Sequence, residues 1–194
     1  MLSELLPVAA YLVGSVSSAV LVSRALMLPD PRHSGSGNPG ATNVLRLGGR
    51  KAAAWTLAGD VAKGALPVVA ARLAGLSAPW LAATALLAFL GHLFPIFFGF
   101  RGGKGVATAL GALTALDPLL GLLLALTWIA IAFTSRYSSL AAIVSAVFAP
   151  VYAWALLPTR SGVLMVIIMA LMLLWRHRRN MANLYAGRET RIGH

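Results

Sequence analysis

The sequence contains no cysteine and little charge of either sign. Without cysteine the protein can form no disulfide, no thiolate nucleophile and no cysteine-ligated metal centre. Charged residues make up 11% of the 194 residues, against about 25% in a typical soluble domain, and hydrophobic residues make up 59%. Because so few charged side chains cannot cover a water-exposed surface, the composition indicates an integral membrane protein.

Acidic residues are the scarcest charged class. Only 5 of them oppose 16 basic residues, which gives a formal net charge of +11. Such an excess is typical of proteins that meet nucleic acid, anionic lipid or an anionic substrate. No two carboxylates are spaced for acid–base catalysis, and no group of His, Asp and Glu resembles a metal site. We therefore expect neither a metal nor another cofactor.

Seven apolar segments, from 11 to 24 residues long, are candidates for transmembrane helices, which need about 20 residues to cross a bilayer. They cover residues 5–28, 52–74, 79–100, 106–116, 119–133, 140–157 and 162–175. Asp117-Pro118, between the fourth and fifth segments, is a typical helix start. The sequence predicts an all-α integral membrane protein, a bundle of about seven transmembrane helices that forms one domain over residues 1–194.

The distribution of basic residues orients this bundle. With seven spans, the odd-numbered connections and the C-terminal tail share one face, and 13 of the 16 basic residues lie on or beside it. By the positive-inside rule this face is cytoplasmic, with the N-terminus outside and the C-terminus inside. Glu4 is the only charge before the first segment, which therefore lacks the positive start of a secretory signal and is expected to be retained.

The first cytoplasmic loop is rich in glycine and small polar residues. Residues 34–43 read Ser-Gly-Ser-Gly-Asn-Pro-Gly-Ala-Thr-Asn, and Arg46 follows. Glycines let successive backbone N–H groups turn toward one point, and hydroxyl and amide side chains add donors, so such a loop suits a phosphate. An ordinary flexible loop has a similar composition, so the choice between a phosphate site and a flexible loop depends on what the other cytoplasmic loops contain.

The second cytoplasmic connection places basic residues among glycines. Residues 99–108 read Gly-Phe-Arg-Gly-Gly-Lys-Gly-Val-Ala-Thr. Arg101 and Lys104 supply positive charge at the start of the fourth segment, whose first N–H groups also favour an anion. Anchoring in lipid headgroups is the alternative role for these two side chains.

Two nucleotide-binding patterns are excluded. Gly35, Gly37 and Gly40 satisfy G-x-G-x-x-G literally, but this fingerprint requires a preceding strand, and here a membrane segment precedes it. The glycines around Lys104 form no Walker A loop, because Phe98 stands where that motif needs glycine.

Asp60, Lys63 and His92 fall inside apolar segments, away from the segment ends. Asp60 and Lys63 lie three residues apart on one face of a helix, and exposing either charge to lipid would be energetically costly. We expect a buried ion pair that stabilises the bundle; the functional alternative is that the pair accepts a proton or orients a loop residue. For His92 we expect a hydrogen-bonded structural role.

Polar residues recur in the third cytoplasmic loop and after the last segment. The loop reads Arg-Tyr-Ser-Ser over residues 136–139, and residues 176–180 read Arg-His-Arg-Arg-Asn. His177 and Asn180 share a helix face if the last helix continues past the membrane. The positive-inside rule explains Arg178 and Arg179 equally well.

These stretches together resemble the bacterial acyl-phosphate:glycerol-3-phosphate acyltransferases, the PlsY family. The matching stretches occur in the family's order at residues 35–46, 60–64, 91–108, 136–140, 177–180 and 187–189, and Ala142 departs from it where relatives often carry Ser. The resemblance implies a seven-helix enzyme of the bacterial inner membrane. It implies transfer of a fatty acyl group from acyl phosphate to the 1-hydroxyl of glycerol 3-phosphate, which gives lysophosphatidic acid and inorganic phosphate in the first step of phospholipid synthesis.

On this resemblance we assign residue roles as a hypothesis. The first loop is expected to hold the phosphate of acyl phosphate, and Arg46 and Lys104 are expected to hold the phosphate of glycerol 3-phosphate. Residues of the third loop and the tail are expected to bind the hydroxyl groups of glycerol 3-phosphate. The glycines of the second loop are expected to let that loop close on the ligand. The expected substrate-binding residues are Ser36, Gly37, Asn38, Gly40, Thr42, Asn43, Arg46, Gly102, Gly103, Lys104, Gly105, Ser139, His177 and Asn180. The expected catalytic residues are His177, Lys104 and Asn180, with His177 or a substrate phosphate oxygen as general base.

Two other classes of function would also place positive charge at one membrane face. A transporter of phosphate or an organophosphate also needs an anion site at a membrane face, but its anion path must continue through outer halves that are almost purely aliphatic here. A scaffold subunit that binds anionic lipid needs positive charge but no glycine-rich loops. The expected partners are therefore two small-molecule substrates and membrane lipid, and not nucleic acid.

Overall fold

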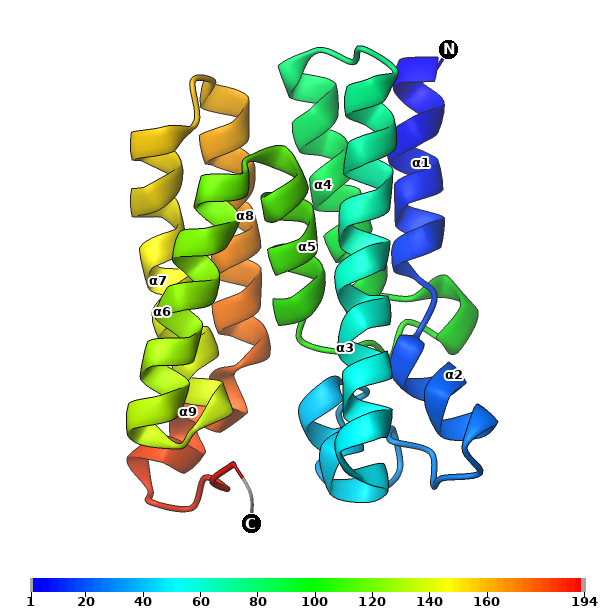
Figure 1. Cartoon of the computed structure of the whole chain (residues 1–194), viewed down its shortest axis with the longest axis vertical. Helices are drawn as coiled ribbons and strands as arrows, with labels where there is room; N and C mark the ends of the chain where they lie inside the picture. The colour runs from blue at the N-terminus through cyan, green and yellow to red at the C-terminus, as the bar shows by residue number, and fades with distance from the viewer. Residues whose placement is uncertain (1, 193–194) are drawn as a thin grey trace. The chain divides into compact units, whose positions relative to one another are not determined.

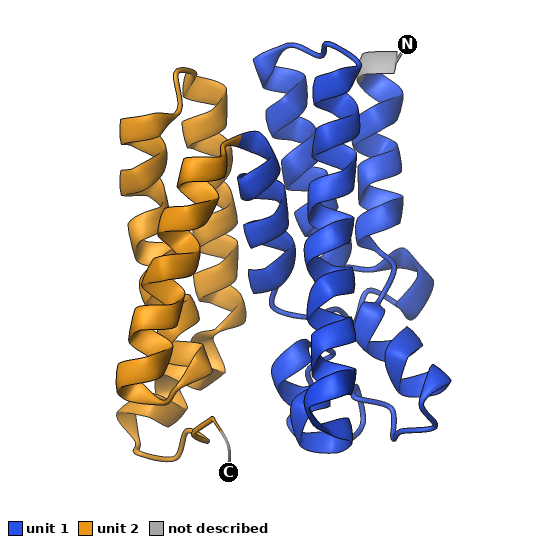
Figure 2. Ribbon diagram, in the orientation of Figure 1, with its two compact units in different colours: residues 1–116 blue, residues 117–194 orange. Residues whose placement is uncertain are grey.

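The computed structural model describes residues 2–192, with side chains from residue 4 onward, as helices joined by loops (Figure 1). No strand occurs within residues 2–192. The chain divides into two compact units, residues 1–116 and 117–194 (Figure 2). The predicted all-helical fold class is confirmed, and the two units are described separately.

Unit 1 consists of two pairs of closely packed helices and the loops between them. Its elements are α1 (Leu2–Gly14), α2 (Ser18–Ala25), α3 (Ala41–Leu73), α4 (Ala78–Leu93), the short 3₁₀ helix η1 (Ile96–Phe98) and α5 (Val106–Leu116). α1 packs on α4 and α3 packs on α5, while α2 lies against α3. The residues from the end of α2 to the start of α3 form the first loop.

Unit 2 is a smaller helical bundle. Its elements are α6 (Pro118–Ser135), α7 (Ser138–Leu156), α8 (Arg160–Arg176) and α9 (Arg178–Tyr185). α7 packs against α6, α8 and α9. The predicted helix start at Asp117-Pro118 is confirmed, because the Asp117 carboxylate accepts a hydrogen bond of 2.8 Å from the Leu120 N–H at the first turn of α6.

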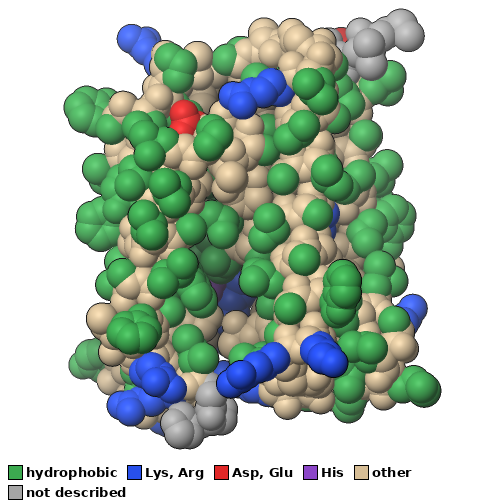
Figure 3. Space-filling view, in the orientation of Figure 1, with side chains coloured by type: hydrophobic (Ala, Val, Ile, Leu, Met, Phe, Trp, Pro, Cys, Tyr) green, Lys and Arg blue, Asp and Glu red, His purple; other side chains and the backbone are tan. Residues whose placement is uncertain are grey.

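The helices form a multi-pass membrane protein. Within the described residues, three stretches are long and apolar enough to cross a bilayer, and two bent helix pairs bring the number to five if each pair is one span. The three are Ala78–Phe98, Pro118–Ser135 and Ser138–Leu156. Hydrophobic side chains cover the lengths of the helices in the space-filling view, while Lys and Arg side chains gather near helix ends (Figure 3).

The first predicted segment was wrong as one continuous helix. The chain bends by 42° between α1 and α2, at residues 15–17. Short hydroxyl side chains favour such a break because they can bond nearby backbone groups. The Ser15 hydroxyl donates to the Tyr11 carbonyl at 2.8 Å, and the Ser17 hydroxyl accepts the Val20 N–H at 3.5 Å as the N-cap of α2.

Two other predicted boundaries also differ. α4 ends at Leu93, seven residues before the predicted Phe100, because the residue before Pro95 is disfavoured in helical conformation. α3 begins at Ala41 instead of 52, and a kink at Gly49, with φ of 76°, separates its first turns from the rest of the helix. Thr42, Asn43 and Arg46 therefore lie on a helix, where the sequence predicted a loop.

Glycines allow both helix pairs of unit 1 to pack at backbone distance. A Cβ atom on Gly14 would lie 2.1 Å from the Ala88 carbonyl oxygen, and one on Gly91 would lie 2.2 Å from the Tyr11 carbonyl oxygen. In the α3–α5 pair, a Cβ on Gly111 would lie 2.1 Å from the Val61 carbonyl oxygen. Close approach of the backbones stabilises helix packing through dispersion contacts, which matter in lipid because the hydrophobic effect does not drive helices together there.

Gly111→Ala is expected to destabilise unit 1 by about 1–3 kcal/mol, because the new methyl group overlaps rigid backbone of α3. The measurement is the thermal unfolding midpoint of the purified protein in detergent. Gly162→Ala in α8 is the matched control, since its Cβ would meet the end of the Leu157 side chain at 3.1 Å, and that side chain can move. Equal midpoints for the two variants would contradict this account of the packing.

Candidate active site

The first loop of unit 1 is held in place by the side chain of Asn43. This buried amide donates to the Pro31 carbonyl at 2.9 Å and to the Ser34 carbonyl at 3.0 Å, and its oxygen accepts the Ser36 N–H at 3.0 Å. Gly35 passes so close that a Cβ would lie 2.3 Å from the Asn43 amide oxygen. Both amide hydrogens of Asn43 serve the loop, so this side chain determines the conformation of the predicted phosphate site.

Backbone N–H groups contribute less to the predicted anion nest than the sequence suggested. The Ser36 N–H donates to Asn43, the Gly37 N–H donates to the Ser34 carbonyl at 3.1 Å, and the Gly40 N–H donates to the Asn38 carbonyl at 2.9 Å. The polar groups that face outward are side chains. Ser36 is exposed, and Thr42 and Arg46 are exposed one turn apart on α3, where residues four apart are neighbours.

An ion pair fastens the early part of the first loop. The Arg32 guanidinium lies 2.6 Å from the Asp30 carboxylate and 5.6 Å from the centroid of the Phe98 ring in η1. The hydrogen bond from Arg32 lowers the pKa of Asp30 from 3.8 to about 2. Because the folded pKa is the lower one, the pair contributes its full stability above about pH 3.8 and loses it as the pH falls through 2.

The glycines of the second loop let it pack tightly on the end of α4. A Cβ on Gly102 would lie 2.0 Å from the His92 carbonyl oxygen, and one on Gly103 would lie 2.2 Å from His92 Nε2. Gly105 has φ of 88° and faces the Phe89 ring, which a Cβ would approach to 2.3 Å. All three glycines are buried, so close packing on α4 explains why glycine stands at each position, and their role in loop closure stays a prediction.

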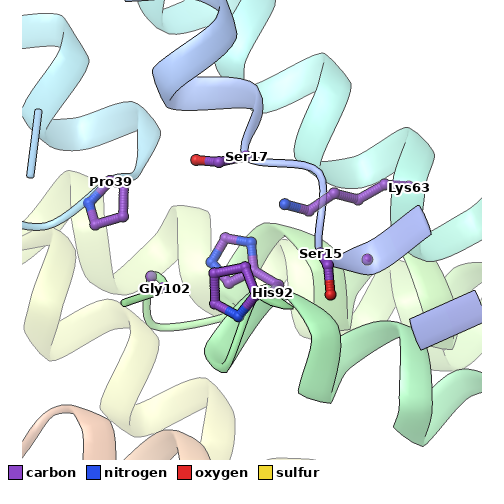
Figure 4. A pocket seen from close by; sticks show the side chains of 9 residues that line it. Ser15, Ser17, Pro39, Lys63, His92 and Gly102 are labelled. Carbon is purple, nitrogen blue, oxygen red and sulfur yellow. The ribbon is translucent and has the colours of Figure 1, made fainter. Parts of the chain in front are cut away.

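The two loops meet at Pro39. A Cβ on Gly103 would lie 3.1 Å from the Pro39 carbonyl oxygen. Around this contact lies a small pocket, drawn in Figure 4, that also reaches the break between α1 and α2. Its lining residues are Gly14, Ser15, Ser17, Pro39, Lys63, His92, Pro95, Gly102 and Gly103. Unit 1 therefore brings both predicted phosphate-binding loops together, with the half-buried Lys104 directly after Gly103.

The predicted ion pair inside the membrane segment is confirmed. Lys63 Nζ lies 2.8 Å from Asp60 Oδ1, and both side chains are buried. The same ammonium group donates to the Val16 carbonyl at 2.8 Å, at the break between α1 and α2. His92 is also buried, and its Nδ1 lies 3.6 Å from Asp60 Oδ1.

In unit 2, Glu189 joins two of the predicted site residues. The Ser139 hydroxyl donates to Glu189 Oε1 at 2.8 Å, and the Asn180 amide donates to the same oxygen at 2.7 Å. Sequence reasoning noted the Gly-Arg-Glu stretch at 187–189 but gave Glu189 no role. The sequence could have indicated a role for Glu189, because it is one of only 5 acidic residues and follows the polar stretch at 176–180.

His177 lies at a sharp bend rather than on a continuing helix. α8 ends at Arg176, and α9 departs from it at 54°, so the last helix does not continue straight past His177, which was the condition for His177 and Asn180 to share a helix face. The imidazole is 2% exposed, and its Nδ1 lies 2.9 Å from the Leu173 carbonyl oxygen. Because a carbonyl only accepts, this contact places the proton of neutral imidazole on Nδ1 and leaves Nε2 as the basic nitrogen.

The described residues contain no cluster of three or more His, Cys, Asp or Glu that could hold a metal ion. The predicted residues instead form two sets of hydrogen-bonding and basic groups. One set belongs to the two loops of unit 1, and the other, Ser139, His177 and Asn180, belongs to unit 2, where Glu189 joins Ser139 and Asn180. Groups of this kind bind and orient anionic or hydroxylated reactants, and His177 can exchange a proton.

Comparison with known proteins is consistent with this chemistry. The model of a family described as glycerol-3-phosphate acyltransferase matches residues 5–187. A glycerol-3-phosphate acyltransferase of Thiobacillus denitrificans is 58% identical, over 100% of this chain and 98% of the relative. The enzyme of that name from Methylococcus capsulatus is 53% identical, over 95% of this chain and 93% of the relative.

Solved structures include two forms of one similar protein. The crystal structure of PlsY (YgiH), an integral membrane glycerol 3-phosphate acyltransferase, in its glycerol 3-phosphate form has a TM-score of 0.94 and 38% identity, over 100% of this chain and 96% of that one. Its lysophosphatidic acid form has a TM-score of 0.91 and 36% identity over the same shares.

Proposed function

We propose, from the premise that this chain belongs to the glycerol-3-phosphate acyltransferase family, that it transfers a fatty acyl group from acyl phosphate to the 1-hydroxyl of glycerol 3-phosphate. The family match over residues 5–187 is the observation that carries this proposal. The protein is an acyltransferase of phospholipid synthesis, and not the phosphate transporter that an anion site at a membrane face also suggested.

The proposed reaction needs no nucleophile from the protein. Acyl phosphate is a mixed anhydride, so the 1-hydroxyl oxygen of glycerol 3-phosphate can attack its carbonyl carbon directly. The new ester C–O bond forms as the bond from that carbon to the phosphate oxygen breaks, inorganic phosphate leaves, and the hydroxyl proton passes to a base. The chain has no cysteine, and the site residues mainly orient and neutralise the two reactants.

The side chains of unit 1 suit two phosphate groups. We assign the phosphate of acyl phosphate to the outward-facing first loop, through the hydroxyls of Ser36 and Thr42. Arg46 and Lys104 hold the phosphate of glycerol 3-phosphate, as charge-assisted hydrogen bonds to phosphate are stronger than neutral ones. The assigned residues of the first loop are Ser36, Gly37, Asn38, Gly40, Thr42 and Asn43, with Asn43 acting through the loop conformation that it fixes.

The side chains of unit 2 are assigned to the hydroxyl groups of glycerol 3-phosphate. Ser139 and Asn180 share the carboxylate of Glu189, which fixes the direction of both side chains. His177, whose ring is oriented by the Leu173 carbonyl, is assigned as the base that takes the proton of the 1-hydroxyl. Glu189 is then a positioning residue that holds Ser139 and Asn180 ready.

The proposed topology has seven crossings in the bacterial inner membrane. They are the α1–α2 pair, α3, α4, α5, α6, α7 and α8, with the N-terminus outside and the substrate site at the cytoplasmic face. Its support is the gathering of 13 of the 16 basic residues near one set of helix ends and loops. α9 then lies on the cytoplasmic side, after the bend at His177.

The absence of cysteine makes this topology directly testable. Ser77→Cys in the α3–α4 connection is expected to react with a membrane-impermeant maleimide in intact spheroplasts. Tyr185→Cys, at a side chain that is 97% exposed, is expected to react only after the membrane is opened. Labelling of both positions from the same side would contradict an odd number of crossings between them.

The acyl donor is tested by product analysis. Purified protein in detergent is given glycerol 3-phosphate together with acyl phosphate or with acyl coenzyme A of the same chain length. We expect lysophosphatidic acid from acyl phosphate alone. Product from acyl coenzyme A but not from acyl phosphate would contradict the proposed donor while leaving the acyltransferase class intact.

A further inference from the structure

The buried charges of Asp60 and Lys63 are not explained by stability alone. Moving two charges out of water costs several kcal/mol per ion, and apolar replacement of such a pair is often neutral or stabilising. Their contacts reach outside α3 in two directions, toward Val16 and toward His92. These contacts indicate that the ion pair holds neighbouring parts of the backbone in position.

The first direction leads to the break between α1 and α2. Lys63 Nζ donates to the Val16 carbonyl at 2.8 Å while it remains 2.8 Å from Asp60. Val16 lies between the helices, where its carbonyl has left the regular pattern of helical hydrogen bonds. Lys63 thus stabilises the bent backbone that lines the pocket in Figure 4 through Ser15 and Ser17.

The second direction leads to the second loop. The His92 ring has Nδ1 3.6 Å from Asp60, and its Nε2 faces Gly103 so closely that a Cβ there would lie 2.2 Å away. The carbonyl of His92 also accepts the Gly103 N–H at 3.2 Å. The position of His92 therefore determines where the backbone of Gly103 lies, one residue before Lys104.

The same backbone touches the first loop at Pro39, between Asn38 and Gly40. Asp60, Lys63 and His92 lie behind both phosphate loops, and none of them is assigned to a substrate. We propose that these three residues are positioning residues: they fix the backbone at Gly103, and with it Lys104, relative to the first loop. This inference rests on the proposed function of Lys104.

The principal test is the double variant Asp60→Asn/Lys63→Met. Removing both charges together avoids leaving one uncompensated charge in the membrane, which would prevent folding. We expect the double variant to fold, with the KM for glycerol 3-phosphate raised about tenfold or more and the KM for acyl phosphate changed less, since misplaced binding groups cost orders of magnitude in efficiency. Arg72→Met is the matched control, because it removes a hydrogen bond of 2.7 Å from the Arg72 guanidinium of α3 to the Leu116 carbonyl. We expect this variant to keep both KM values of the wild type.

A purely structural pair would give a different result. It would lower the thermal midpoint and the active fraction, and so kcat, while both KM values stayed at those of the wild type. That outcome would overturn the proposal.

A substitution series at His92 tests the second direction. The amide nitrogen of asparagine can occupy the position of His92 Nδ1 and donate to Asp60, whereas alanine cannot. We expect the KM for glycerol 3-phosphate to rise less in His92→Asn than in His92→Ala. Equal values in the two variants would contradict a role for the contact with Asp60.

Hydrogen exchange separates this inference from the proposed function. The peptide that contains Gly102–Gly105 should exchange its amide hydrogens faster in Asp60→Asn/Lys63→Met than in the wild type, with Arg72→Met as the control. Unchanged exchange would overturn the proposal even if the enzyme is active. Failure of the wild-type protein to use glycerol 3-phosphate would overturn the proposed function and leave this measurement interpretable.

Discussion

Lys104→Ala is expected to raise the KM for glycerol 3-phosphate by about 30-fold or more, or to abolish turnover. Lys104 is the lysine between Gly103 and Gly105 in the second loop, and it is half-buried where this loop meets the first. Truncating one partner of a desolvated, hydrogen-bonded charge pair costs about 2–5 kcal/mol, which corresponds to this range in affinity. The measurement is steady-state kinetics with glycerol 3-phosphate varied at saturating acyl phosphate.

Lys51→Ala is the matched control for this experiment. Lys51 is an exposed lysine of α3 with no assigned role, and its removal should leave both kinetic constants close to those of the wild type. If the function of Lys104 were anchoring in lipid headgroups, the two lysine variants would behave alike. Unchanged KM and kcat in Lys104→Ala would refute the assigned role.

His177→Ala is expected to lower kcat by about 10²- to 10⁴-fold, the usual contribution of a general base. The contact between Nδ1 and the Leu173 carbonyl leaves Nε2 to accept the hydroxyl proton. As a base, His177 must be neutral to act, so kcat of the wild type should fall as the pH is lowered through the pKa of this imidazole. That acidic limb should be missing from the residual activity of His177→Ala.

The pH profile distinguishes the two roles that His177 could have. A loss of activity with an unchanged profile would show that His177 positions the substrate and that a phosphate oxygen of the substrate is the base. His33→Ala, at an exposed histidine of the first loop, is the control and should match the wild type in both rate and profile. Full activity in His177→Ala would exclude either role.

The features that could be predicted from the sequence are those set by local composition. Apolar runs predicted helices, Asp117-Pro118 predicted a helix start, and the spacing of Asp60 and Lys63 predicted an ion pair. Each depends on residues close together in the chain. The glycine-rich stretches likewise predicted that two loops would be special, and Pro39 and Gly103 do bring those loops into contact.

The features that were missed depend on tertiary contacts. Hydropathy does not reveal the break at residues 15–17, because the residues on both sides are apolar and the partner of the Val16 carbonyl is Lys63, 47 positions away. The carboxylate shared by Ser139 and Asn180 comes from Glu189, which is 50 positions from Ser139. The sequence likewise does not show how closely the glycines of the second loop pack on α4.

The most direct test is phosphate release by the purified protein. With acyl phosphate alone we expect no release above the uncatalysed rate, because in direct transfer only the 1-hydroxyl of glycerol 3-phosphate takes the acyl group. Addition of glycerol 3-phosphate should start release, with one lysophosphatidic acid formed for each phosphate. A burst of phosphate without glycerol 3-phosphate, or release without lysophosphatidic acid, would contradict direct transfer between two bound substrates.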